Sequence, residues 1–142
     1  MVVTFITLLT IAGSFTGPVL TNASMEPSAI GSLLASAPDL AIFLIELASP
    51  RYLSAGVHTQ IGSVQVSDTQ DFSWGLGIGI QHSTNGDALW QNGMTFAFRS
   101  VMVIYPNEGH GVVVLTNSAS GLPVAYDVAE RALGGKARWK YF

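Results

Sequence analysis

Residues 96–116 read FAFRSVMVIYPNEGHGVVVLT. The first ten are apolar on both faces apart from Arg99 and Ser100, which is typical of a strand in the middle of a sheet. The PNEG segment that follows has the composition of a tight turn. The final GVVVLT is rich in β-branched residues and favours a returning strand. This stretch therefore predicts an antiparallel β-hairpin.

Upstream of this hairpin, the sequence from Phe72 alternates with a period of two. Large residues alternate with glycine along one predicted strand: Trp74, Gly75, Leu76, Gly77, Ile78, Gly79 and Ile80. Glycines on one face of a strand indicate that another element packs closely there. Asn85-Gly86 predicts a hairpin turn that leads into Ala88-Leu89-Trp90, with a loop after Trp90.

Two helices are expected, one before and one after these strands in the sequence. Ser36 is an N-cap residue, Pro38 lies in the first turn, and Asp39 follows the cap by three positions. One apolar stripe is then formed by Leu40, Phe43, Leu44 and Leu47, and Ile42 and Ile45 widen it, so we expect cover on more than one side. The second helix carries an apolar face, and Gly134-Gly135 ends it; its face comprises Leu122, Ala125, Tyr126, Ala129 and Leu133.

These elements predict an α+β fold, with an antiparallel sheet formed by a meander of three to four strands and flanked by helices. Residues 54–71 are weakly patterned and are expected to be a loop with a short helical turn. We divide the chain into an apolar N-terminal segment and loop, residues 1–27, and a domain over residues 28–142.

The segment Met1–Leu20 is strongly apolar and has three interpretations. It is too interrupted for the roughly 20 apolar residues of a membrane span. It also lacks the basic start of a signal peptide, since Arg51 is the first basic residue. An apolar strand, or an irregular start inherited from a longer protein, is favoured, and a targeting segment or a membrane contact through Met1–Ala12 stays open as an alternative.

The composition excludes several functional classes. The charged fraction of 11% and the hydrophobic fraction of 49% suggest contact with a membrane or with additional protein. A net charge of −3 without a basic cluster argues against nucleic-acid binding. The chain has no cysteine, which excludes disulfides and thiol nucleophiles.

A search for catalytic signatures finds little. No serine stands three places before a lysine, and no G-x-S-x-G motif occurs. The three histidines are widely spaced, the acidic residues are scattered, and we expect neither a metal site nor a cofactor. Two segments match the three-residue shapes of a catalytic motif: Y-x-N at Tyr105-Pro106-Asn107 and S-x-N at Ser83-Thr84-Asn85. Turn geometry explains both segments.

Three passages nevertheless resemble the second half of a serine hydrolase family, that of class C β-lactamases, esterases and D-alanyl-D-alanine carboxypeptidases. Residues 29–44, AIGSLLASAPDLAIFL, are similar to the start of a helix in that family. Residues 74–78, WGLGI, resemble its Y-G-L-G-W strand. Residues 98–117 resemble its closing hairpin, which ends in G-V-V-V-L-T-N.

The resemblance implies a partial β-lactamase/transpeptidase-like fold and a substrate-binding strand. Members of the family carry a Lys- or His-containing triad ending in glycine, which corresponds here to Gln91, Asn92 and Gly93. Gly93 matches, whereas Gln91 replaces the usual cation, which puts recognition of a substrate carboxylate in doubt. The N–H of the next residue, Met94, is implied as an oxyanion donor, because an edge strand presents unpaired N–H groups. An ordinary loop at residues 91–94 is the alternative.

By this resemblance the complete protein hydrolyses a small-molecule ester, amide or β-lactam through a serine acyl-enzyme in a bacterial periplasmic, secreted or cytoplasmic location. The family's Ser-x-x-Lys nucleophile is missing, so we expect this chain to be the C-terminal part and to be inactive alone. The alternative function is a non-catalytic α+β module that binds a partner through apolar surface.

Overall fold

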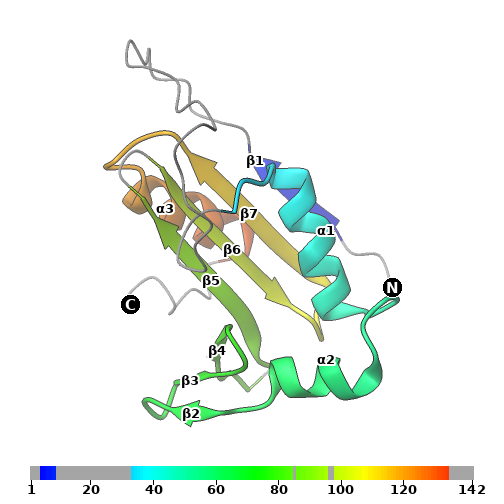
Figure 1. Ribbon diagram of the computed structural model, residues 1–142. Helices are drawn as coiled ribbons and strands as arrows, with labels where there is room; N and C mark the ends of the chain where they lie inside the picture. Colours follow the sequence, from blue (N-terminus) through cyan, green and yellow to red (C-terminus); the bar gives the residue numbers. More distant parts are fainter. Residues whose placement is uncertain (1–3, 9–32, 85, 96–97, 135–142) are drawn as a thin grey trace.

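The computed structural model describes residues 4–8, 33–84, 86–95 and 98–134. Over these residues seven strands form one sheet in the order β1-β7-β6-β5-β4-β3-β2, and three helices accompany it (Figure 1). The strands are β1 (Thr4–Leu8), β2 (Val66–Ser67), β3 (Phe72–Trp74), β4 (Gly79–Gln81), β5 (Ala88–Met94), β6 (Arg99–Tyr105) and β7 (His110–Thr116). The helices are α1 (Ala37–Ala48), α2 (Ala55–Gly62) and α3 (Leu122–Ala132).

The predicted α+β class and the antiparallel meander are confirmed, but the sheet is larger than three to four strands. Strands β2 to β7 pair antiparallel with their neighbours in sequence order. β1 adds a parallel edge strand beside β7, with Thr4 opposite His110. Since β2 and β3 have only two and three residues, they are too short to produce a detectable alternation.

A helix covers each face of the sheet (Figure 1). α3 closes one face, where Trp90, Val103 and Val112 pack with Ala125 and Ala129. α1 lies on the other face, over a second buried cluster formed by Ala41, Leu44, Leu47, Ile78, Ile80, Leu89, Ile104 and Val113. The strands at the centre of the sheet are therefore apolar on both sides, which explains the continuous apolar pattern of β6.

The start of α1 is formed as predicted. The hydroxyl of Ser36 accepts from the N–H of Asp39, and the Asp39 carboxylate accepts from the N–H of Ser36, at 3.4 and 3.0 Å. This reciprocal pair is a capping box. The Ser36 hydroxyl also donates to the Asp39 carboxylate at 2.6 Å, and this side-chain bond, followed by the bond from the Ser36 N–H, holds the pKa of Asp39 below its ordinary value.

The expectation of cover on more than one side of α1 is wrong. Leu44 and Leu47 are buried, whereas Ile42 is 63% exposed and Phe43 is 44% exposed. The buried positions fall on one narrow stripe, which packs against the sheet in the described part of the chain. Ile42 and Phe43 thus form an apolar outer face of α1.

The single strand predicted from Trp74 to Ile80 is also wrong, because the chain reverses within it. β3 ends at Trp74 and β4 starts at Gly79, and the N–H of Gly75 donates to the carbonyl of Ile78 at 2.8 Å. Gly77 has φ +76°, a conformation that glycine adopts without steric cost. The close packing expected of the glycines does occur at Gly75 and Gly79. An added Cβ would meet the Ile61 carbonyl at 2.3 Å from Gly75, and the Trp90 ring at 2.4 Å from Gly79.

The hairpin between β4 and β5 is present but its connection is longer than a two-residue turn. Gln81 pairs with Ala88, so that residues 82–87 form the connection. Gly86 has φ +113°, and Asn85 lies outside the described residues. The β6–β7 turn is confirmed, with Gly109 at φ +70° and its N–H bonded to the Tyr105 carbonyl.

The remaining elements agree only in part with expectation. The loop expected over residues 54–71 contains a complete helix, α2, and the short strand β2. α3 buries Ala125 and Ala129 as predicted and is followed by Gly134 at φ +77°. Phe96, Ala97 and Gly135 lie outside the described residues, as does most of the Met1–Leu20 segment.

Candidate substrate-binding edge of the sheet

Residues 91–94 form the second half of β5 and not a loop. All four pair with β6, from Gln91 opposite Met102 to Met94 opposite Arg99. On its other side, β5 pairs with β4 only as far as Trp90. In the described part of the chain no strand pairs with this side of residues 91–94, which we call the open edge of β5.

The direction of the backbone donors follows from the hydrogen bonds at the end of β5. The N–H of Thr95 donates to the Phe98 carbonyl at 3.0 Å, on the side of β6. Because successive N–H groups of a strand point to opposite sides, the N–H of Met94 points to the open edge. The N–H of Asn92 has the same direction, and it lies 3.2 Å from Oε1 of the Gln91 side chain.

The side chains of these residues have separate surroundings. Asn92 Nδ2 donates to the Tyr126 hydroxyl of α3 at 2.8 Å, so that it anchors β5 to the helix. Burial raises the pKa of Tyr126, and the hydrogen bond with Asn92 opposes this shift. Gln91 is half-buried and Met94 is 66% exposed.

Gly93 lies against a serine of the neighbouring strand. A Cβ at this position would lie 2.5 Å from Oγ of Ser100, which is its partner on β6. A larger residue would therefore require the Ser100 hydroxyl to move. The glycine leaves room for this hydroxyl within the open edge of β5.

The fold also brings together three residues, Ser73, His82 and Asp87, that no sequence motif connects. Ser73 Oγ lies 2.8 Å from His82 Nε2, and His82 Nδ1 lies 3.0 Å from the Asp87 carboxylate. This is the order of contacts found in Ser-His-Asp relays. Ser73, however, is only 4% exposed within β3, so the arrangement orients Asp87 without presenting a hydroxyl to substrate.

The signal that was missed is the register of the β4–β5 hairpin. Once Gln81 pairs with Ala88, His82 and Asp87 are the next residues to face each other across the connection. A two-residue turn at Asn85-Gly86 would have given a different register. In the β6–β7 turn, Glu108 contacts His110, the first residue of β7, at 3.1 Å.

The two motif-like segments lie in turns, as their composition predicted. Tyr105 is the last residue of β6 and is buried at 1% exposure, and Asn107 belongs to the turn that follows. Ser83 lies in the 82–87 connection. The described residues of the two segments are not part of the open edge of β5.

The described residues contain neither a metal-binding cluster nor a membrane-spanning helix. No group of three or more His, Asp or Glu residues in that part of the chain is arranged to hold a metal ion. None of its helices combines the length and the apolar character needed to cross a bilayer.

Comparison with known proteins identifies the family. A sequence model described as Beta-lactamase matches residues 10–136, which include every described element from α1 to α3. A comparison with curated proteins found no match. With most of its length matched, and with an open α+β sheet of the expected kind, the chain belongs to the Beta-lactamase family, whose members are serine hydrolases.

Proposed function

We propose that this chain is the C-terminal part of a serine hydrolase that cleaves an ester, amide or β-lactam through an acyl-enzyme, and that residues 91–94 bind the substrate. The observation that carries the proposal is the open edge of β5. Half of this strand is paired on both sides, and the other half offers backbone groups to a ligand.

The open edge suits stabilisation of an oxyanion. A backbone N–H held in a sheet cannot turn away when negative charge develops, and removal of one such donor typically costs about 3 kcal/mol of transition-state stabilisation. The Met94 N–H points to this edge, and its strand is held by β6 along the opposite edge and by the Asn92–Tyr126 hydrogen bond to α3, which covers one face of the sheet. Gln91 stands where the family has a cation. Its side chain can therefore offer a substrate carboxylate only uncharged hydrogen bonds.

The nucleophile has to come from another segment of polypeptide. No serine in the 142 residues precedes a lysine by three positions, and the Tyr105 side chain is buried. The outer face of α1, with Ile42 and Phe43 exposed, is the kind of surface that such a segment would cover. The chain alone is therefore expected to be catalytically inactive.

A backbone substitution tests the binding edge. Met94→Pro removes the N–H without removing a bond of the β5–β6 ladder, because this N–H points away from β6. With ¹⁵N-labelled protein, millimolar benzylpenicillin or a nitrophenyl ester should shift the amides of residues 92–95, and the proline variant should abolish the shifts at 92, 93 and 95. Met94→Leu, which keeps the N–H, is the matched control and should bind like the parent chain.

Two results would overturn the proposal. Equal ligand shifts in the proline and leucine variants would remove the role of the Met94 N–H. A burst of nitrophenol or of hydrolysed chromogenic β-lactam that depends on a serine of this chain would show that the chain carries its own nucleophile.

The alternative is a non-catalytic module that binds a protein partner, and the same apolar outer face of α1 favours it. The two functions differ at the open edge, since the module needs no ligand there. Absence of shifts at residues 92–95 with every acyl compound would favour the module.

A further inference from the structure

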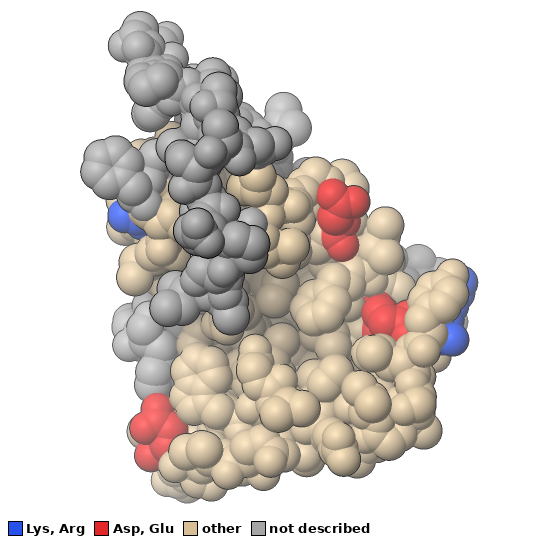
Figure 2. All heavy atoms as spheres, viewed as in Figure 1, with Lys and Arg blue, Asp and Glu red and all other residues tan. Residues whose placement is uncertain are grey.

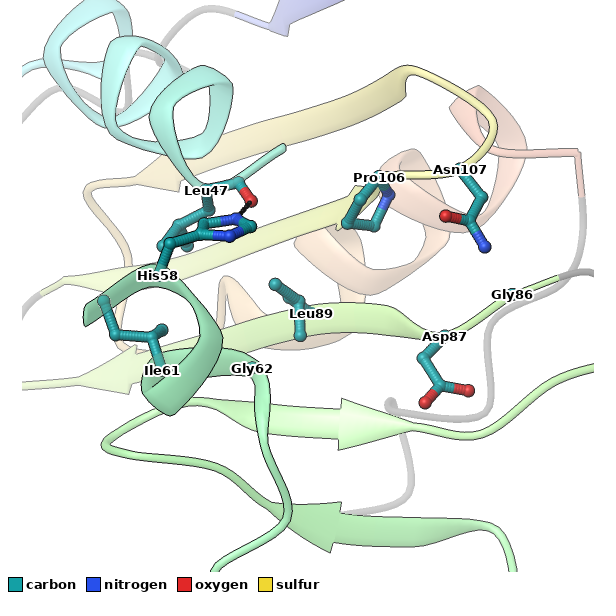
Figure 3. Close-up of a pocket in the computed structure, with 9 residues that line it drawn as sticks. All are labelled: Leu47, His58, Ile61, Gly62, Gly86, Asp87, Leu89, Pro106 and Asn107. Atoms are coloured by element: carbon teal, nitrogen blue, oxygen red, sulfur yellow. Dashed lines mark hydrogen bonds between the residues drawn. The ribbon is translucent and has the colours of Figure 1, made fainter. Parts of the chain in front are cut away.

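A cavity of about 440 Å³ lies beside the first half of β5, separate from the open edge. Its volume is within the usual range of small-molecule sites, about 300–1,000 Å³. Figure 3 shows its wall built from the end of α1, from α2, and from the connections on either side of the β5–β6 pair. The lining residues are Leu47, His58, Ile61, Gly62, Gly86, Asp87, Leu89, Pro106 and Asn107.

One carboxylate dominates the charge of this cavity. Asp87 lines it, and no lysine or arginine is among the nine residues. The carboxylate is oriented by His82 Nδ1 at 3.0 Å and by the Ser83 N–H at 3.4 Å. His82 is in turn held by Ser73 at 2.8 Å. Because a carboxylate has about four acceptor positions, Asp87 can still accept a hydrogen bond from a ligand.

The other polar groups add acceptors and not positive charge. His58 Nε2 lies 2.8 Å from the Leu47 carbonyl, which can only accept, so this nitrogen carries a proton and leaves Nδ1 as an acceptor in the neutral ring. Asn107 adds a neutral amide with a donor, Nδ2, and an acceptor, Oδ1, and its Nδ2 is the atom that a Cβ added at Gly86 would meet, at 2.4 Å. In Figure 3, Asp87 and Asn107 lie at one end of the cavity and His58 at the other, with Leu89 between them.

We propose that this cavity binds a small organic amine, with the ammonium group on Asp87 and the apolar body over Leu89, Ile61 and Leu47. A cation is selected because the lining holds the Asp87 carboxylate and no lysine or arginine, and because His82 and the Ser83 N–H occupy only part of the acceptor capacity of Asp87. The apolar floor selects a hydrocarbon body over an inorganic cation. The site does not depend on acyl transfer at the open edge, and it places a second ligand on the same sheet.

The test is a titration of ¹⁵N-labelled chain with phenethylamine, compared with the neutral 2-phenylethanol and with phenylacetate. The amine should shift the amides of Gly62, Gly86, Asp87 and Asn107 and leave residues 92–95 unchanged. Asp87→Asn should weaken amine binding about fivefold, as expected for a partly exposed charge pair. Asp127→Asn removes an exposed carboxylate on α3 and should leave the affinity unchanged.

A second variant tests the cavity without altering Asp87. A Cβ at Gly62 would meet nothing within 4 Å, so Gly62→Leu has room to enter the cavity and should abolish binding, whereas Gly62→Ala should preserve it. The proposal is overturned if phenylethanol binds as well as the amine, if Asp87→Asn and Asp127→Asn have the same effect, or if Gly62→Leu binds normally.

Discussion

Gly79 shows at the residue scale how closely this sheet is packed. An added Cβ would lie 2.4–2.8 Å from three atoms of the Trp90 indole, and Trp90 is itself 3% exposed and packed against Trp74, with ring centroids 5.5 Å apart. Gly79→Ala should therefore destabilise the fold by about 1–3 kcal/mol, because overpacking forces the indole out of its rotamer. The midpoint of urea denaturation, followed by tryptophan fluorescence, measures this loss.

The matched control for Gly79 is another glycine with free space around it. A Cβ at Gly56 of α2 meets nothing within 4 Å, and alanine favours a helix by about 0.5–1 kcal/mol over glycine. Gly56→Ala should be neutral or stabilising. Equal losses at the two positions would show that the Trp90 contact does not restrict position 79.

At the scale of one element, the end of α1 is held by a single carboxylate. Glu46 Oε1 accepts from the backbone N–H groups of Arg51, Tyr52 and Leu53 at 2.8, 2.6 and 2.8 Å. The Leu53 N–H is the main cause of a pKa below the ordinary 4.5, and the N–H groups of Tyr52 and Arg51 add to it. Because the folded pKa is lowered, the charged form stabilises the fold above pH 4.5, and this stability is lost as the pH falls through the folded value.

Glu46→Gln tests this assignment. The variant should unfold at lower urea than the parent chain at pH 7, and the difference should shrink as the pH falls below 4.5, since the parent carboxylate becomes protonated. Asp68→Asn removes a charge at an exposed position and should keep the parent's pH dependence. A difference between Glu46→Gln and parent that persists unchanged at pH 3 would contradict the assignment.

For the whole molecule, the distribution of charge and apolar surface predicts self-association. Uncharged side chains cover most of the face shown in Figure 2, where the charged groups are few and scattered, and the net charge is only −3. Ile42 and Phe43 are exposed on α1. Little electrostatic repulsion therefore opposes contact between apolar faces.

The double variant Ile42→Glu/Phe43→Lys should lower the average mass at high protein concentration, as measured by sedimentation or light scattering, without lowering the denaturation midpoint. Val124→Glu changes a similarly exposed residue on α3, which is 43% exposed, and should have the smaller effect. An unchanged mass for the α1 variant would place association on another surface.

Local patterns predicted those elements whose signals lie within a few neighbouring residues. The hairpin of β6 and β7 follows from β-branched residues around PNEG, and the cap of α1 follows from Ser36 and Asp39, because turns and caps are formed by contacts three or four positions apart. Strands β2 and β3 and helix α2 have weak local patterns and were not predicted. No local pattern marks Gln91–Met94 as a site. These residues became the candidate site only through the resemblance to a family.

The sequence by itself determined the α+β class, the central hairpin, both long helices and the absence of a Ser-x-x-Lys nucleophile. Tertiary structure decided where β4 stops along β5, and so which part of that strand has an open edge. It also decided which face of α1 is covered, and that Ser73, His82 and Asp87 meet. The physical reason is that strand register and helix packing depend on contacts between residues far apart in the chain, which no local pattern of residues records.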